Sequence, residues 1–412
     1  MNRQTGSGVD SFRVLHLIDS GGLYGAEKVI LSLLAEQRRE GMDPILLSAG
    51  EPNVGDKAIE QAAERLGIQV VPWRMRSGLN LRQTRRILRW ACSQGIGLLH
   101  SHGYKFNILM GLWPRPWRAQ LPLVCTLHGY VKAPRWSKMA VYEALDRIVL
   151  QRADGVALVD KTMRHRLPNR VSESSLCRVI PNGLDNATPK TASLRKGLGQ
   201  FTASHGVNLI AVGRLAREKG FDTLIQAYVD YPEELANTGV VVFGDGPLRD
   251  TFQAQISEAG LDDQIMLVGY ADAAGLMPHF DALVMPSRTE GLPMTVLEAL
   301  RAELPIIATR VGGVPAALDG LESALLVEPE RPDQIANAVA QFTASNDHGR
   351  HGHELRQRFV THYSASAMAE GYRRLYEDVL LAAPPSGPTQ HHHRATRVTQ
   401  TNNLGGRQRD SP

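Results

Sequence analysis

The sequence lacks any apolar run long enough to cross a membrane. Its longest apolar stretches, at 121–127 and 149–159, are broken by Arg, Asp or Pro. Neither approaches the roughly 20 residues that a membrane-spanning helix needs. The first twelve residues, MNRQTGSGVDSF, also lack the apolar core of a signal peptide. We therefore expect a cytoplasmic protein.

Cysteine is scarce as well. The chain has three cysteines, Cys92, Cys125 and Cys177. Their odd number and scattered spacing argue against a disulfide framework and against a cysteine-based metal site. We expect small buried thiols in a reducing compartment.

Acidic residues are missing from one long window. Between positions 65 and 142 there is no Asp or Glu, although the window holds thirteen Arg or Lys and all five Trp of the chain. Residues 1–190 carry 27 basic against 16 acidic side chains, whereas residues 191–412 carry 19 against 26. Because folded surfaces usually mix both signs, the two halves are expected to meet different partners.

The chain has the length of two domains rather than one. A single hydrophobic core rarely serves 412 residues. Short apolar strands alternate with amphipathic helices between 12 and 184, and the alternation restarts between 207 and 363. Such alternation builds a parallel sheet covered on both faces. The predicted fold class is therefore α/β, with two Rossmann-like domains in series.

The apolar pattern also places the individual elements. The predicted strands are 12–18, 44–48, 68–72, 97–100, 123–127, 156–159 and 178–180 in the first domain, and 208–212, 240–243, 265–268, 282–285, 306–309 and 325–327 in the second. Helices of the second domain are expected to begin near 220, 247, 272, 293 and 315.

Composition predicts the remaining boundaries. We expect a flexible N-terminus over 1–11, a first domain over 12–184, a polar linker over 185–206 and a second domain over 207–363. A C-terminal helix over 364–383 is expected to pack back toward the first domain. Residues 384–412 are almost free of apolar side chains, which predicts a disordered tail.

In open parallel sheets, ligands bind beyond the carboxyl ends of the strands. Gly21, Gly22 and Gly25 follow the first predicted strand, where glycine lets the backbone approach a ligand and the helix behind favours an anion. The loop is not G-x-G-x-x-G, and no acidic ribose ligand follows the second strand. Both departures argue against a nicotinamide dehydrogenase.

The strand ends of the second domain carry charged residues. VGRLAREKG places Arg214 and Lys219 at the mouth of the crevice, and two cations there suit a diphosphate. In MPSRTEGLPMTVLEAL, Glu290 lies in a loop and Glu298 follows eight positions later. Each residue alone could be a solvated or ion-paired side chain. Four ionisable groups at successive strand ends favour a ligand site.

The combination of GRLAREKG, FGDGP and EGLPMTVLEAL closely resembles the retaining nucleotide-sugar glycosyltransferases of family 4. These have the GT-B fold, in which two Rossmann-like domains face each other across a cleft. Glu290 and Glu298 match the two acids of the family's E-x7-E motif. The resemblance includes the GG turn, the TLHG stretch around His128 and IPNGLD at the domain junction, and it spans roughly residues 12–380.

The resemblance implies roles for individual residues. The implied catalytic set is Arg214, Lys219, Glu290 and His128. The implied donor-binding set is Gly22, Gly244, Gly246, Gly291, Leu292 and Glu298. The two cations would bind the donor diphosphate, and Glu298 the ribose hydroxyls. Glu290 and His128 would face the donor sugar; for His128, a role as general base is the alternative.

The implied activity is retaining transfer of a hexose-type sugar from a nucleotide sugar to a saccharide or lipid-linked acceptor, in cell-surface polysaccharide or glycolipid biosynthesis. The chain has no Asp-x-Asp motif, so we expect no metal and no cofactor besides the donor substrate. A related GT-B enzyme, such as a sugar-nucleotide epimerase or a phosphorylase, is one alternative. A non-catalytic sugar-nucleotide-binding protein is another.

The segment 81–90, LRQTRRILRW, predicts a helix with Leu81, Thr84, Ile87 and Leu88 on one side. The basic residues around the rest are Arg82, Arg85, Arg86 and Arg89. Arginine with tryptophan is typical of helices that lie on anionic membranes. A solvated arginine face over core tryptophans is the alternative, and no nucleic-acid-binding signature accompanies the charge. We expect an acceptor or membrane face here, on the inner side of the plasma membrane.

Overall fold

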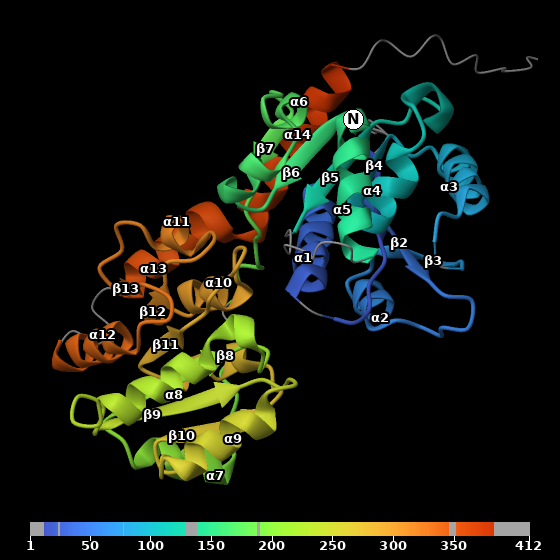
Figure 1. Cartoon of the computed structure of the whole chain (residues 1–412). Helices are drawn as coiled ribbons and strands as arrows, with labels where there is room; N and C mark the ends of the chain where they lie inside the picture. The colour runs from blue at the N-terminus through green and yellow to red at the C-terminus, as the bar shows by residue number, and fades with distance from the viewer. Residues whose placement is uncertain are drawn as a thin grey trace, which may run out of the picture.

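The computed structural model describes residues 12–23, 25–76, 78–128, 138–187, 190–345 and 352–382. The segment 1–11 and the tail 384–412, for which flexibility and disorder are predicted, lie outside these ranges. Within them the chain forms two sheets, each with its own set of covering helices (Figure 1). Among the described helices, none is both long and apolar enough to cross a bilayer.

The first half is built on a seven-stranded sheet in the order β3-β2-β1-β4-β5-β6-β7, with parallel neighbours throughout. Its strands are β1 (Arg13–Ile18), β2 (Asp43–Gly50), β3 (Gln69–Arg74), β4 (Leu98–His102), β5 (Leu123–Leu127), β6 (Gly155–Leu158) and β7 (Cys177–Val179). The order reverses between β1 and β4, and such a reversal opens a crevice for ligands. Strands β4 and β5 are buried along their whole length, because helices cover both faces.

Helices alternate with these strands. They are α1 (Gly25–Arg39), α2 (Ala58–Arg65), α3 (Leu81–Ser93), α4 (Tyr104–Gly111), α5 (Lys138–Val149) and α6 (Asn169–Ser172). Helix α3 begins after Asn80, whose side chain accepts a hydrogen bond from the amide of Gln83. An N-cap of this kind satisfies an amide that has no partner inside the helix.

The second half is built on a six-stranded parallel sheet in the order β10-β9-β8-β11-β12-β13, with its reversal between β8 and β11. Its strands are β8 (Val207–Val212), β9 (Thr238–Phe243), β10 (Ile265–Gly269), β11 (Ala282–Met285), β12 (Ile306–Thr309) and β13 (Ala324–Val327). Its helices are α7 (Lys196–Ala203), α8 (Phe221–Asp230), α9 (Arg249–Glu258), α10 (Met294–Arg301), α11 (Val314–Leu318), α12 (Pro332–Ala344) and α13 (Gly352–Arg358).

Two segments differ from the predicted pattern. After Asp272, where a helix is predicted, the chain forms the short 3₁₀ turns Ala273–Gly275 and Met277–His279. Pro278 lacks the N–H that a continuing helix would use, which explains the interruption. Within 185–206, helix α7 buries Leu198 and Phe201 in the core of the second sheet, so this half of the segment is packed.

The chain crosses between the two halves at two neighbouring points. Leu184 and Ser364 form a parallel bridge, and a Cβ placed on Gly183 would lie 2.4 Å from the carbonyl oxygen of Ser364. No side chain fits there, which explains the glycine. After a π-turn at Phe359–Tyr363, helix α14 (Ala365–Leu381) lies against α1 and β6 of the first half (Figure 1).

The carboxyl edges of the two sheets face each other. Gly25 lies close to Met294, since a Cβ placed on this glycine would be 3.0 Å from Cγ of the methionine. A Cβ on Gly291 would lie 3.8 Å from the carbonyl oxygen of His128, at the end of β5. These residues lie in the loops, or at the helix starts, that follow the strands. The carboxyl ends of both sheets therefore meet here, and we call this meeting place the crevice.

Candidate functional site

The loop after β8 presents two cations at this crevice. Lys219 folds its aliphatic stem over the strand end, because a Cβ on Gly213 would lie 3.4 Å from Cδ of the lysine. Arg214 is exposed, and its guanidinium forms no ion pair within the described residues. Both cations predicted for the diphosphate therefore belong to one loop at the ligand-binding edge.

Glu290 receives two hydrogen bonds on one carboxylate oxygen. Lys219 Nζ lies 2.6 Å and Ser287 Oγ 2.7 Å from Oε1 of Glu290. The carboxylate is 9% exposed and the lysine side chain 24%. The pair keeps a partly buried carboxylate neutralised and holds the lysine ammonium at the crevice. The structure thus brings Lys219, which follows β8, into contact with Glu290, which follows β11.

The glycines of the FGDGP turn have a packing role. A Cβ on Gly244 would lie 1.8 Å from the carbonyl oxygen of Gly213, and one on Gly246 would lie 2.5 Å from that of Leu215. The amide of Leu215 also donates to the carbonyl of Asp245 at 3.0 Å. The turn after β9 therefore packs against the loop that carries Arg214 and supports it.

Glu298 lies on α10, is 9% exposed and forms no hydrogen bond through its carboxylate within the described residues. Burial raises its pKa, while the charges of Lys28 and Arg301 act in the opposite direction. Buried polar groups are normally hydrogen-bonded in folded proteins. A buried carboxylate whose lone pairs are unused is suited to ligand hydroxyls, as the E-x7-E resemblance implies for the ribose.

Three other residues of the implied donor-binding set are held by core packing or by hydrogen bonds of their backbone. Leu292 is 8% exposed, and its side chain belongs to the core of the second sheet. Gly291 accepts a hydrogen bond from the amide of Gly313 at 2.7 Å. In the first half, the amide of Gly22 donates to Ser20 Oγ at 3.2 Å, which fixes the loop after β1.

His128 comes from the first half and completes the crevice. Burial lowers its pKa to about 4, so its imidazole is neutral at neutral pH. Its Nδ1 is buried and has no partner among the described residues. A group with this pKa is a weak proton acceptor at neutral pH, whereas its lone pair can accept a hydrogen bond. The low pKa argues against general base catalysis by His128 at neutral pH.

Several residues at the crevice were not predicted from the sequence. Ser287 donates to Glu290, and Lys28 pairs with Asp272 across the two halves at 3.6 Å. Asp160 caps the turn after β6, and its Oδ2 faces Gly313 of the second half, 2.7 Å from a Cβ placed there. For Asp160 a sequence signal existed, because it directly follows a predicted strand.

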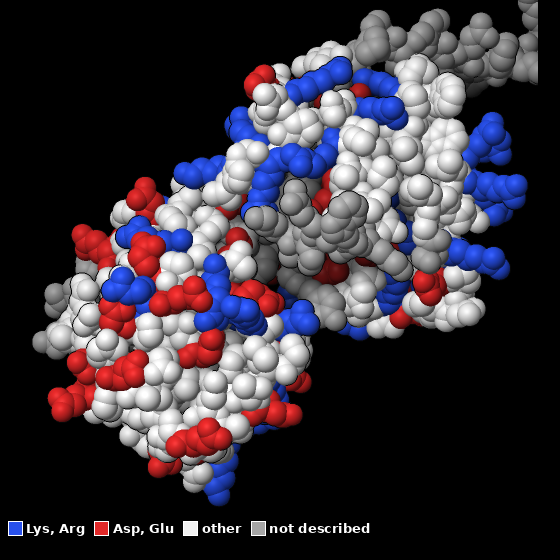
Figure 2. Space-filling view, viewed as in Figure 1, with Lys and Arg blue, Asp and Glu red and all other residues white. Residues whose placement is uncertain are grey.

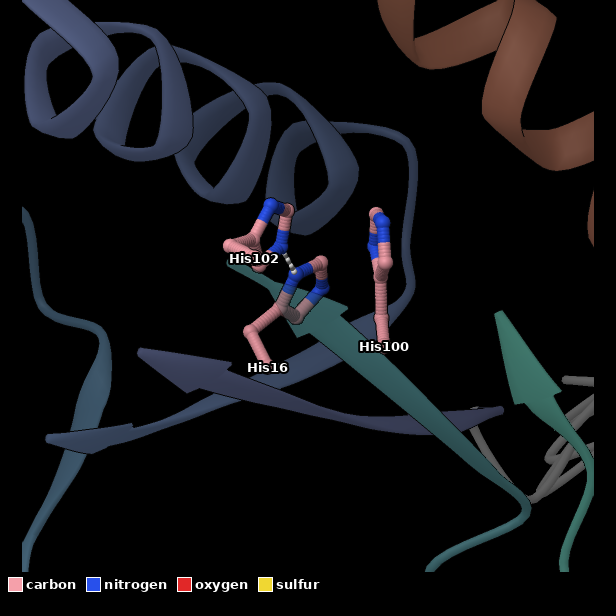
Figure 3. A group of neighbouring side chains, drawn as sticks. All are labelled: His16, His100 and His102. Carbon is pink, nitrogen blue, oxygen red and sulfur yellow. Dashed lines mark hydrogen bonds between the residues drawn. The ribbon is translucent and has the colours of Figure 1, made fainter. Parts of the chain in front are cut away.

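The described residues also contain one cluster with metal-ligand chemistry. His16, His100 and His102 place one nitrogen each within 4.8 Å of one another (Figure 3). They are buried in the first sheet, on β1 and β4. Their ring nitrogens already have hydrogen-bond partners in the protein. The donor atoms are those of a metal site, but their lone pairs are in use.

The basic face of α3 is present on the surface. Thr84, Ile87 and Leu88 are buried as predicted, whereas Leu81 is 46% exposed because it starts the helix at its open end. The exposed residues are Arg82, Arg85, Arg86 and Arg89. Figure 2 shows Lys and Arg side chains projecting from the edge of the molecule where α3 lies.

In the rest of the acid-free window, the fold brings acidic side chains from other segments next to the basic ones. Arg74 pairs with Glu60 at 2.8 Å and Lys105 with Asp19 at 2.8 Å. Arg118, fully buried, pairs with Asp154 at 2.6 Å. These three acids lie outside the window in sequence and neutralise part of its positive charge. Among the described residues, most of the basic side chains of the window that lack an acidic partner lie on α3.

The tryptophans of the window divide in the same way. Trp73, Trp90 and Trp113 pack against the core of the first sheet, and Trp117 is 71% exposed. Trp136 lies outside the described residues. Three of the four described tryptophans are therefore core residues, as the alternative interpretation of the window predicts.

Two family models match the chain. Residues 24–188 match Glycosyltransferase Family 4, and residues 204–363 match Glycosyl transferases group 1. The matched regions correspond to the two sheets and their strand-end loops, including Gly25, Arg214, Glu290 and Glu298.

Individual proteins show the same similarity. The chain is 25% identical over 237 residues to a GDP-mannose-dependent alpha-(1-6)-phosphatidylinositol monomannoside mannosyltransferase of Mycobacterium tuberculosis; the match covers 55% of this chain and 61% of the relative. It is 25% identical over 334 residues to a D-inositol 3-phosphate glycosyltransferase of Corynebacterium jeikeium, covering 74% and 77%. Anabaena Alr3699/HepE, solved in complex with UDP, superimposes with a TM-score of 0.74 at 19% identity, over 89% of this chain and 100% of that one.

Proposed function

Since the chain belongs to the family-4 glycosyltransferases with the GT-B fold, we propose that it transfers a hexose-type sugar from a nucleoside diphosphate sugar to a saccharide or lipid-linked acceptor, with retention of configuration. The observation that carries the proposal is the Lys219–Glu290 pair at the crevice, whose lysine lies on the same loop as Arg214. The pair supports the proposal because a cation suited to a diphosphate lies 2.6 Å from a carboxylate that can accept hydrogen bonds from sugar hydroxyls.

Each residue at the crevice has a defined part in this reaction. Arg214 and Lys219 stabilise the negative charge that develops on the departing diphosphate. Glu290 accepts hydrogen bonds from the sugar, and Glu298 from the ribose. His128 accepts one more from the opposite domain. The acceptor hydroxyl attacks the anomeric carbon from the side on which the diphosphate leaves, and the leaving phosphate takes the hydroxyl proton.

The proposal is tested with the purified full-length chain and a panel of UDP- and GDP-hexoses, scored by release of the nucleoside diphosphate. We expect turnover of at least one member, and a fall in kcat/KM of about tenfold in a Glu298→Ala variant, which loses the proposed hydrogen bonds to the ribose. Nucleotide-sugar binding without turnover, in the presence of an acceptor panel of lipid-linked saccharides, would instead support a non-catalytic binding protein.

The proposed chemistry does not need a divalent cation. The side chains of Arg214 and Lys219 supply the positive charge that a metal ion would otherwise provide, and the sequence has no Asp-x-Asp motif. We therefore expect donor turnover to be unchanged by excess EDTA. A complete loss that added Mg²⁺ or Mn²⁺ restores would contradict this charge assignment.

We further propose that α3 holds the enzyme against an anionic membrane, which would present a lipid-linked acceptor to the first domain. Each exposed basic residue near an anionic bilayer contributes about 1 kcal/mol of binding. The full-length chain should sediment with vesicles containing phosphatidylglycerol but not with phosphatidylcholine vesicles, and added salt should weaken the binding.

A charge-reversal pair sharpens this prediction. Changing Arg82, Arg85, Arg86 and Arg89 to Glu should release the protein from the vesicles while donor turnover persists. The matched control reverses four exposed basic residues of the second half, Lys190, Arg195, Lys196 and Arg310. Equal loss in both variants would show that net charge, and not α3, drives binding.

A further inference from the structure

A buried polar network runs behind His128. His16 lies on β1 and His100 and His102 lie on β4, all within the core of the first half (Figure 3). Gln37 of α1 and Tyr376 of α14, both fully or nearly fully buried, join them. Buried imidazole and amide groups are costly unless they are hydrogen-bonded, so the hydrogen bonds among these groups offset the cost of burying them.

One branch of the network leads to His128. Gln37 Oε1 lies 2.9 Å from His16 Nε2, and His16 Nδ1 lies 2.9 Å from His102 Nε2. His102 Nδ1 lies 3.4 Å from His128 Nε2. Two imidazoles, those of His16 and His102, therefore connect the amide of Gln37 on α1 with His128 at the crevice.

The second branch leads away from the crevice. Gln37 Nε2 donates to the hydroxyl of Tyr376 at 3.2 Å, and this hydroxyl lies 2.7 Å from His100 Nδ1. His100 Nε2 lies 2.7 Å from Thr126 Oγ1, which is 2.8 Å from the hydroxyl of Tyr372. The amide of Gln37 is the junction of both branches.

The chemistry of these groups fixes where the protons lie. The amide oxygen of Gln37 only accepts, so His16 carries its proton on Nε2. A neutral His16 then accepts on Nδ1, which requires a proton on Nε2 of His102. By the same step His102 accepts on Nδ1, and His128 carries its proton on Nε2. Burial lowers the pKa of all four histidines, which keeps them neutral as this pattern requires.

The opposite pattern is disfavoured at the crevice. If the amide of Gln37 were reversed, every proton along the branch would move, and His128 would carry a proton on Nδ1. That atom is buried and has no partner among the described residues. An orphaned buried N–H is rarer in folded proteins than an unused lone pair. The orientation with a lone pair on Nδ1 is therefore the stable one.

The same pattern removes the metal-ligand interpretation of the cluster. A neutral imidazole has one lone pair. That of His16 accepts from His102, that of His102 accepts from His128, and that of His100 accepts from Tyr376. A metal ion would have to break the network at each of the three histidines.

We propose that Gln37 is a positioning residue for His128: through His16 and His102 it sets the tautomer of His128, so that the Nδ1 lone pair is available to a hydroxyl of the donor sugar. This inference rests on the proposed contact between His128 and the donor. It assigns the buried histidines a role in selecting one hydrogen-bonding state of a residue at the crevice.

The tautomer is measured directly by NMR of the full-length chain labelled with ¹⁵N-histidine, with the His128 signals identified by their absence in a His128→Gln variant. We expect the His128 proton on Nε2 in the wild type. A proton on Nδ1 overturns the proposal, as does about one bound metal per chain in elemental analysis of the purified protein. Both readouts are independent of any substrate.

Variants test whether Gln37 is the cause. Gln37→Met removes both hydrogen-bonding atoms. We expect both tautomers of His128 to appear, and kcat/KM for the donor to fall about twofold when the two are equally populated. In Gln37→Glu a carboxyl oxygen still accepts from His16, so the tautomer and most activity should return. Tyr372→Phe, at the far end of the other branch, should change neither.

The outcomes separate the inference from the proposed function. A His128 tautomer that is unchanged in Gln37→Met overturns the positioning role. If the tautomer responds but His128→Ala leaves donor turnover intact, the sugar contact is wrong and the link from Gln37 to the reaction is overturned with it. If Gln37→Met does not fold, the tautomer of His128 in the wild type and in the Gln37→Glu variant still tests the positioning role.

Discussion

Replacing Arg214 or Lys219 with Ala is expected to lower kcat/KM for the nucleotide sugar by about 10²–10³, mostly through kcat. The departing diphosphate gains charge in the transition state, so a cation at the crevice contributes more there than in the ground state. For Lys219 the loss includes a second effect, because Glu290 would keep only its hydrogen bond from Ser287. Steady-state kinetics with the preferred donor measure both variants.

Arg217 provides the matched control for this experiment. It is an exposed cation in the same loop, between the two residues tested. Arg217→Ala should retain near-wild-type kcat/KM, and all three variants should unfold at similar temperatures. If Arg214→Ala and Lys219→Ala turn over the donor as well as Arg217→Ala does, these cations do not bind the diphosphate.

The strands could be predicted from the sequence almost completely. Every predicted strand overlaps one of β1 to β13, with ends that differ by a few residues. Parallel strands with both faces covered are short continuous apolar runs, and here Gly, Pro or charged residues punctuate them. The signal is local, so a single sequence carries it.

The failures have a different cause. The prediction of a helix after Asp272 ignored Gly275 and Pro278. These residues break the segment into two short 3₁₀ turns. The acid-free window predicted a wholly one-signed surface, yet Asp19, Glu60 and Asp154 reach into it from outside. Ion pairs between distant segments cannot be read from a window of sequence.

The site shows the same division. Arg214, Lys219 and Glu290 stood out in the sequence because each follows a strand and matches a family motif, and the structure brings Lys219 and Glu290 into contact. Ser287, Lys28 and the network behind His128 depend on contacts across the sheets and between the two halves. His16 and His100 lie in the predicted strands 12–18 and 97–100 and were a signal of buried polar chemistry. Only the fold shows which groups satisfy them, and that His102 joins them on β4.

The buried histidines also predict a marked loss of stability in mild acid. Burial lowers the pKa of His16 to about 3, and burial lowers the pKa of His100 and His102 well below its usual range. Below pH 6.5 these residues take up protons in the unfolded chain but not in the folded one. The unfolded state is therefore favoured progressively as pH falls, and stability is retained only above the unfolded pKa.

The expected size follows from proton linkage, at about 1.36 kcal/mol per pH unit for each such group. His16 alone should cost about 2 kcal/mol between pH 6.5 and pH 5, and His100 and His102 act in the same direction. Glu40 and Glu298, whose pKa burial raises, act in the opposite direction. The histidines of the folded core outnumber them, so the net change is a loss.

Tryptophan fluorescence isolates this effect, because all five Trp lie within 65–142, in the half that holds the histidine network. Urea unfolding of the full-length chain followed by this signal should show a midpoint that falls steadily between pH 7 and pH 5. A His100→Gln variant loses one of the proton-linked groups, and its midpoint should fall less steeply. A midpoint in the wild type that stays constant down to pH 5 would mean that the histidines are not held neutral in the core, and the proton pattern derived for His128 would fail with it.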